Sequence, residues 1–110
     1  KKYLFDSIIE KCQDAKKPFA IYSQWRIVIE DYIFSKPVMI GIAVRTPQPG
    51  DLYQLEQDMW KAQRQWPDLK YAILVHDTDH FEETAKSLNY WSLKGNMVDL
   101  KVLEELLAQL

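Results

Sequence analysis

Cysteine, glycine and proline are scarce in this 110-residue chain, which has one, three and five of them respectively. The single cysteine, Cys12, excludes an internal disulfide and a zinc site built from thiolates. It also favours a reducing, cytoplasmic location. The three glycines lie far apart, so the chain has neither a P-loop nor a Rossmann fingerprint. The serines lack the flanking glycines of a nucleophile elbow, so a hydrolase triad is not supported.

An excess of one charge and long apolar runs are also missing. The chain has 14 Lys and Arg against 16 Asp and Glu, for a formal net charge of -2. Because non-specific affinity for nucleic acid comes from clustered Lys and Arg, any contact with DNA or RNA must be local. The longest apolar runs, 26–29 and 38–44, are far shorter than the roughly 20 residues that span a bilayer. We therefore expect no membrane segment.

Apolar residues are plentiful: 47% of the chain is hydrophobic and 13% is aromatic. This composition is enough for a folded core, and the length matches one compact domain. We expect residues 1–110 to form a single α/β domain. The chain begins Lys1-Lys2-Tyr3 without a hydrophobic signal region, and we expect it to be excised from a longer protein.

The first half of the sequence predicts one helix and three strands. Apolar residues at helical spacing predict a helix over 3–17, which a proline then ends. Alternating apolar residues predict a strand over 19–25. Runs rich in β-branched and aromatic residues predict a hairpin of strands 27–34 and 38–45, with its turn near Ser35-Lys36-Pro37.

The second half predicts two or three helices between short strands. Apolar residues spaced three and four apart predict a helix over 52–66. The continuous apolar run 71–75 is typical of a parallel strand that is covered on both faces. Asp79 can cap a further helix, and a short strand is expected at 91–94. A leucine-rich helix is expected to begin after Asp99.

The resulting order, α-β-β-β-α-β followed by a C-terminal helix, predicts an α/β fold with a mixed sheet. A helix between strands 38–45 and 71–75 favours a right-handed crossover within that sheet. Over roughly residues 3–76, this order resembles the core of the PD-(D/E)XK superfamily of restriction, RecB-type and resolvase nucleases. The resemblance implies a restriction-endonuclease-like fold, with strands 38–45 and 71–75 in the same sheet.

The resemblance also implies where catalytic residues lie. Family members often carry a Glu on the first helix, an Asp on the second core strand, a carboxylate-x-Lys triplet on the third, and a Gln on the next helix. The residues at these places here are Glu10, Glu30, Asp31, the triplet Ala43-Val44-Arg45, and Gln57, with Gln54 and Gln63 on the same helix.

The triplet departs from the family pattern. Ala43 cannot bind a metal, and Arg45 keeps a positive charge but is a poor proton shuttle. We therefore expect a nuclease-like domain that lacks the usual metal triad and acts as a nucleic-acid-binding or regulatory module. A hairpin turning near Lys36-Pro37 would set Glu30 opposite Ala43 and diagonal to Arg45. A structural ion pair between Glu30 and Arg45 is favoured there over a catalytic remnant.

An active nuclease with altered metal ligands is the first alternative. Its candidate ligands for Mg or Mn are Asp31, His76, Asp77 and His80, and Glu10 could join Asp31. The two histidines follow the apolar strand 71–75, at the edge of the sheet where ligands bind in open α/β folds. A loop with a helix cap is the favoured interpretation of this segment.

A protein-interaction domain is the second alternative. Trp60 and Tyr53 fall beside the apolar stripe of the helix 52–66 and, with Lys61 and Arg64, predict a surface patch for a protein or nucleic-acid partner. The tryptophans and tyrosines offer stacking surfaces for unpaired bases, although a core is their commoner use. The last helix is expected to close the domain, and its pairing with a second copy in a homodimer is the alternative.

Overall fold

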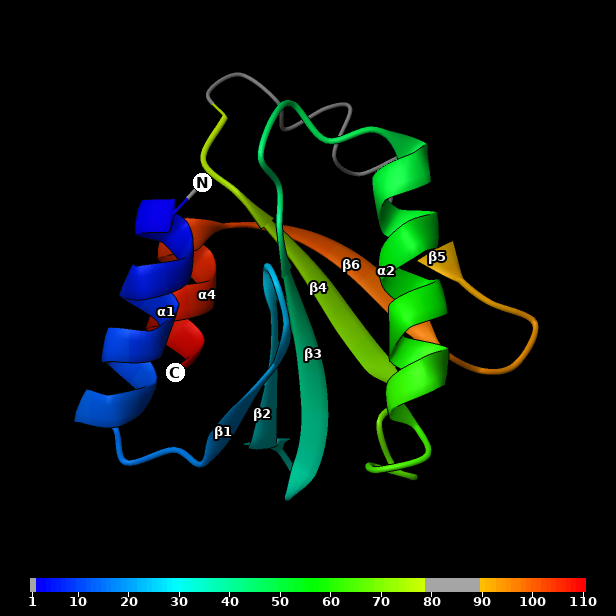
Figure 1. Cartoon of the computed structure of the whole chain (residues 1–110), viewed down its shortest axis with the longest axis horizontal. Coiled ribbons are helices and arrows are strands. Elements are labelled where there is room, and N and C mark those ends of the chain that lie inside the picture. Colours follow the sequence, from blue (N-terminus) through cyan, green and yellow to red (C-terminus); the bar gives the residue numbers. More distant parts are fainter. Residues whose placement is uncertain (1, 79–89) are drawn as a thin grey trace.

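The computed structural model describes residues 2–78 and 90–110, which form an α/β fold (Figure 1). In chain order, its elements are α1 (Lys2–Asp14), β1 (Phe19–Ser23), β2 (Arg26–Ile33), β3 (Lys36–Ile42), α2 (Pro49–Ala62), β4 (Tyr71–His76), β5 (Tyr90–Trp91), β6 (Met97–Val102) and α4 (Leu103–Gln109). The strands form one mixed sheet in the order β1-β2-β3-β4-β6-β5. The predicted α/β class with a mixed sheet is confirmed.

Helix α1 follows the predicted apolar spacing. Leu4, Ile8 and Cys12 recur every four residues, so they share one face, and all three are fully buried. The helix ends at Asp14, three residues before the predicted end. Lys16 adopts a left-handed φ of 55°, which no α-helix continues.

The hairpin of β2 and β3 turns earlier than the sequence predicts. Phe34 and Ser35 form a two-residue turn with φ of 54° and 59°, and Ile33 pairs with Lys36. Turns with two left-handed residues match the twist of the flanking strands, which is why they connect tight hairpins. The turn sets Ile29 opposite Val38 and Arg26 opposite Gly41.

Helix α2 carries the chain across the sheet from β3 to β4. It begins at Pro49, before the predicted start, because proline fits the first helical turn and Asp51 accepts a hydrogen bond from the Gln48 N–H at 2.8 Å. Beyond it, β4 pairs in parallel with β3, with Met39 opposite Ala72. The expected pairing of the two apolar strands in one sheet is confirmed.

The C-terminal segment corrects two predictions. The strand expected at 91–94 is only Tyr90–Trp91, and the helix expected after Asp99 begins at Leu103 instead. Residues Met97–Val102 form β6, parallel to β4, because Val98 and Leu100 face the core beneath α2 while Asp99 faces the other layer. The helix expected after Asp79 lies outside the described residues.

Two layers of helix cover the sheet. Helices α1 and α4 pack on one face, and α2 packs on the other (Figure 1). Each face has its own core, and alternate residues of β2, β3 and β4 supply the two cores in turn. Strand β6 adds Val98 and Leu100 to the core under α2. Among the described helices, none is long and apolar enough to cross a membrane.

Candidate functional sites at the two ends of the sheet

The residues predicted for a nuclease centre are not gathered together. Glu10 is exposed on α1, and Glu30 and Asp31 are exposed on β2. Because the hairpin turns at Phe34-Ser35, Glu30 lies beside the start of β3 and not opposite Ala43. The predicted ion pair between Glu30 and Arg45 is therefore wrong: Trp66 Nε1 donates to Glu30 at 3.4 Å, and Arg45 bonds to Asp51.

The predicted metal ligands are also separated. Asp31 lies near the end of β2, which runs antiparallel to β3, whereas His76 ends β4, which runs parallel to β3. They therefore lie at opposite ends of the sheet. His76 is buried, its Nδ1 accepts a hydrogen bond from the Thr78 N–H at 3.3 Å, and burial lowers its pKa against the opposing effect of Glu104.

His80 lies outside the described residues, so its role as a ligand stays a prediction. Asp77 follows His76 directly, in the loop after β4. Within residues 2–78 and 90–110, no group of three or more His, Cys, Asp or Glu side chains is placed to hold a metal ion.

A hollow of about 180 Å³ lies where β2 begins and β3 ends, and we call it the arginine hollow. Its lining comes from the β1–β2 turn, the two strands, α2 and β4, namely Trp25, Arg26, Ile42, Ala43, Val44, Arg45, Asp51, Gln54 and Leu74. The carboxyl end of β3 therefore brings the triplet Ala43-Val44-Arg45 to its edge. Since β2 runs antiparallel to β3, Arg26 at its start arrives at the same place.

Each arginine of the hollow is held by an aspartate of α2. Arg26 Nε donates to Asp58 Oδ2 at 3.0 Å, and Arg45 Nη1 donates to both carboxylate oxygens of Asp51 at 3.0 and 2.8 Å. Gln54 Nε2 donates to Asp58 Oδ1 at 3.2 Å and so braces the first pair. The two aspartates therefore orient the two guanidinium groups and balance their charges.

Gly41 provides the space for the Arg26 side chain. The Cβ of any larger residue at Gly41 would lie 3.1 Å from Arg26 Nη1 and 2.9 Å from Leu55 Cδ1. The absent side chain therefore lets the Arg26 guanidinium lie against the strand under α2.

The glutamine beside the hollow is Gln54, not the predicted Gln57. Gln57 projects elsewhere from α2, and its Nε2 is buried without a hydrogen-bond partner among the described residues. Arginine suits phosphate and carboxylate groups because its fork of N–H donors matches their paired oxygens. Arginine keeps its positive charge and is therefore a poor proton shuttle. The two guanidinium groups of the hollow can therefore bind an anion.

The patch predicted beside the apolar stripe of α2 is only partly open. Tyr53, Lys61 and Arg64 are exposed as expected. Trp60 is half-buried, and Lys94 Nζ lies 4.4 Å from the centre of its ring. This cation–π contact with the loop before β6 was not predicted, because the two residues are far apart in sequence. A partner for the patch stays a prediction.

The opposite end of the sheet carries a groove of about 330 Å³, which we call the aromatic groove. It lies where β2 ends and where β3, β4 and β6 begin, and its lining residues are Tyr32, Ile33, Phe34, Lys36, Pro37, Asp68, Lys70, Tyr71, Trp91, Gly95 and Met97. These residues come from separate stretches of the chain. The groove therefore could not be predicted from the sequence, although the tyrosines and tryptophans were predicted to offer stacking surfaces.

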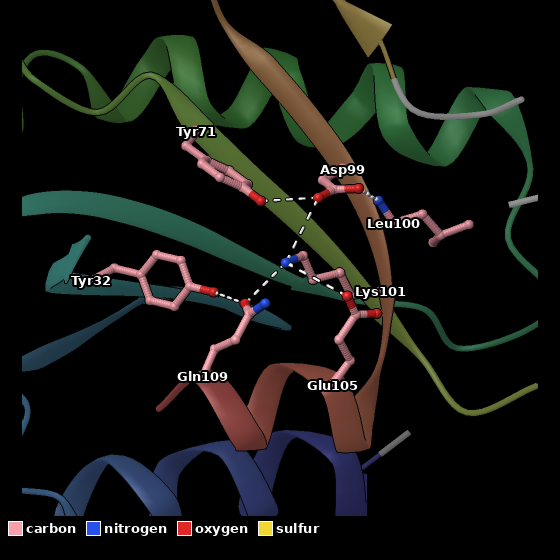
Figure 2. Close-up of polar contacts among 7 residues, drawn as sticks. All are labelled: Tyr32, Tyr71, Asp99, Leu100, Lys101, Glu105 and Gln109. Carbon is pink, nitrogen blue, oxygen red and sulfur yellow. Dashed lines mark hydrogen bonds and ion pairs between the residues drawn. The ribbon is translucent and has the colours of Figure 1, made fainter. Parts of the chain in front are cut away.

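A hydrogen-bonded network lies behind the two tyrosines of the groove (Figure 2). The Tyr71 hydroxyl donates to Asp99 Oδ2 at 2.9 Å, and the Leu100 N–H donates to Asp99 Oδ1 at 2.9 Å. The Tyr32 hydroxyl donates to Gln109 Oε1 of α4. Burial raises the pKa of Tyr32 to about 12, and the negative charge of Asp99 adds to the effect. Both phenols therefore stay neutral donors at neutral pH, since burial also raises the pKa of Tyr71.

Lys101 completes the network. Its Nζ donates to Gln109 Oε1 at 2.9 Å and lies 3.9 Å from carboxylate oxygens of both Asp99 and Glu105 (Figure 2). The buried Asp99 charge is therefore compensated within the protein. Because Glu105 and Gln109 belong to α4, the network ties that helix to β2, β4 and β6.

Helix α4 closes the domain, as expected. Leu103 and Leu106 are buried in the core shared with α1, and Leu107 and Leu110 pack against it. The homodimer that the sequence suggested through this helix would need the apolar face that the core already occupies.

In comparisons with protein-family models, with curated proteins and with solved structures, no match to this chain was found.

Proposed function

We propose that this chain is a nuclease-like domain that binds nucleic acid without cleaving it. The proposal rests on the arginine hollow. Where the family resemblance expects a carboxylate-x-Lys triplet, this chain has Ala43-Val44-Arg45, and Arg45 lines one hollow together with Arg26. Two guanidinium groups there favour binding of a phosphodiester over activation of water.

The connection of the strands supports the nuclease-like part of the proposal. Strands β1, β2 and β3 form an antiparallel meander, α2 crosses over, and β4 joins β3 in parallel. This is the order that the resemblance requires. The separation of Asp31 from His76 supports the absence of cleavage, since a metal site needs its ligands at one place and the described residues hold no group of three candidate ligands.

The exposure of Arg45 supports phosphate binding. Its side chain is 61% exposed, and within the described part of the chain it bonds to Asp51 through Nη1 alone. The other N–H groups of the Arg45 guanidinium can therefore bind a phosphate while Nη1 keeps its hydrogen bonds to Asp51. Because Asp51 and Asp58 balance both arginines, few counterions are released, and we expect modest affinity with a shallow dependence on salt.

The test is fluorescence anisotropy of labelled single- and double-stranded DNA and RNA over a range of salt. We expect Arg45→Gln to weaken binding and to reduce the slope of log affinity against log salt by about 1, because one phosphate contact is lost. The matched control is Lys11→Gln, which removes an exposed cation from α1 on the other face of the sheet. Equal affinity of Arg45→Gln and the unsubstituted chain would overturn the proposal.

The alternative, an active metal-dependent nuclease, is tested with the same substrates in the presence of Mn²⁺. We expect no cleavage. Cleavage that Asp31→Ala abolishes would replace the proposal with an enzyme whose metal site uses other ligands.

A further inference from the structure

We infer that the aromatic groove is a docking site for a partner protein, and that it takes a segment in which a bulky apolar side chain lies next to a carboxylate. This inference is independent of nucleic-acid binding at the arginine hollow, because the two sites lie at opposite ends of the sheet. It rests on how the groove presents its rings, its turn and its charges.

The tyrosines present carbon surface to the groove. The Tyr71 hydroxyl is engaged with Asp99, and the Tyr32 hydroxyl is engaged with Gln109, both behind the groove (Figure 2). The two rings meet edge to face, with centroids 6.2 Å apart. With both hydroxyls bonded inside the protein, the floor of the groove favours an apolar side chain over a polar one.

The rim holds large apolar side chains in water at a cost. Phe34 is 92% exposed and Trp91 is 69% exposed, and Ile33 is exposed beside them. Phe34 also adopts the left-handed φ of 54°, a conformation that is rare and strained for a bulky residue. A glycine or asparagine would fit this turn without strain. Strain that holds a phenyl ring in solvent, next to a groove, is typical of a binding surface.

The charges of the groove select an anion beside the apolar group. Lys36 and Lys70 line it together with one acid, Asp68, so the lining carries two positive charges and one negative. Asp99 adds no uncompensated charge, because Tyr71, the Leu100 N–H and Lys101 surround it. An apolar residue with a neighbouring Asp or Glu therefore matches both the floor and the rim.

A protein segment fits these features better than a nucleic-acid strand does. A groove that tracks a phosphate backbone is lined by several cations, whereas this lining has an excess of one positive charge. Interface cores are built from Trp, Tyr, Phe and Met with few charges, and the groove has all four types.

The test uses NMR of the full chain with two pools of amidated peptides. One pool fixes a Phe, Leu or Trp beside an Asp or Glu, and the other has Lys in place of the acid. We expect the acidic pool to shift the amide signals of residues 32–36, 70–71 and 91. It should bind roughly fivefold more tightly than the Lys pool, because an exposed charge pair at the rim contributes about that factor. No shift with either pool would overturn the inference.

Three variants sharpen the test. Trp91→Ser should lower the affinity for the acidic pool about tenfold, because a central aromatic anchor is lost. Lys36→Glu should reverse the preference between the pools. Leu93→Ser is the matched control, since Leu93 is fully exposed yet does not line the groove, and it should leave affinity unchanged. Amide spectra report whether each variant keeps the fold.

Two further outcomes would replace the proposed occupant. Groove signals that shift with single-stranded oligonucleotides and not with peptides would assign the groove to unpaired bases. Groove signals that depend on protein concentration, and lose that dependence in Trp91→Ser, would assign it to a second copy of the chain.

Discussion

The two ends of the sheet use their polar groups in opposite ways. At the arginine hollow, each arginine has an aspartate from α2, and the pair of Arg45 and Asp51 lies near the surface. At the aromatic groove, the tyrosine hydroxyls turn inward to a buried carboxylate and to α4, and the rings of Phe34 and Trp91 are exposed. The hollow therefore presents polar groups above the apolar core, whereas the groove presents apolar rings above a network of hydrogen bonds.

The two ends of the sheet should contribute differently to the stability of the fold. Pairs of exposed charges contribute little, because water screens them and their side chains lose freedom when they pair. Removing a buried carboxylate or one of its donors lowers the free energy of unfolding far more, because the remaining polar group is left buried without a partner. The polar groups behind the groove should therefore matter for folding, and the exposed pair of Arg45 and Asp51 at the hollow should matter mainly for binding.

Removal of Asp99 should have the largest effect. We expect Asp99→Ala to lower the free energy of unfolding by about 3 kcal/mol, because the Tyr71 hydroxyl and the Lys101 ammonium lose a buried partner. Urea unfolding of the variant measures the change. Arg45→Gln at the hollow is the comparison and should cost less than about 1 kcal/mol, because its ion pair with Asp51 is exposed. Equal losses in the two variants would break the contrast between the ends.

Filling the space at Gly41 should come next. Gly41→Val places methyl groups against Leu55 and the Arg26 guanidinium, and we expect a loss of about 2 kcal/mol from overpacking. Urea unfolding gives the loss, and Gly50→Ala is the control, since a Cβ there meets nothing within 4 Å. A Gly41→Val chain as stable as the control would show that α2 can shift away from the strand.

High pH should weaken the groove end. The pKa of Tyr32 is raised to about 12 from an ordinary value of 10.0, so the native state keeps a proton that the unfolded chain releases. Stability from this residue is complete below about pH 10 and is lost as the pH rises toward about 12, by on the order of 1–2 kcal/mol. Urea unfolding at several alkaline pH values measures the slope, which Tyr32→Phe should reduce. An unchanged slope in that variant would assign the alkaline loss to other groups.

Release of Arg45 should have the smallest effect on folding. We expect Asp51→Ala to cost about 1 kcal/mol, because the ion pair with Arg45 is exposed and most of the loss comes from the hydrogen bond that the Gln48 N–H donates to Asp51. The same variant should bind oligonucleotides more tightly, since Arg45 then carries an unbalanced charge. Anisotropy at fixed salt measures the gain, and weaker binding would show that Asp51 is needed to orient the arginine.

The elements that sequence reasoning predicted well are those whose apolar pattern repeats locally. The buried face of α1 at Leu4, Ile8 and Cys12 and the continuous run of β4 needed no distant information. The errors lie where local and distant preferences compete. Leu100 fits the leucine spacing of a helix, yet pairing with β4 and burial beneath α2 place it in a strand.

The candidate sites show the same division. Arg45 was identified because it ends the predicted strand 38–45, where the family resemblance expects the Lys of a carboxylate-x-Lys triplet, and it does line a hollow. Its partner was predicted as Glu30 and is Asp51, because a hairpin turn shifted toward Phe34 changed which residues lie opposite. A small shift of register changes every pair along two strands, so pairs are harder to predict than the strands themselves.

The sequence by itself determined the α/β class, the apolar strands at the centre of the sheet and the amphipathic helices that cover it. These depend on periodicity, which each segment carries alone. Only the tertiary structure decided that Arg26 joins Arg45 at one end, and that Tyr32, Tyr71 and Trp91 join at the other. The reason is physical: a site is made by side chains from several strands, and their meeting depends on strand order and register, which no single segment encodes.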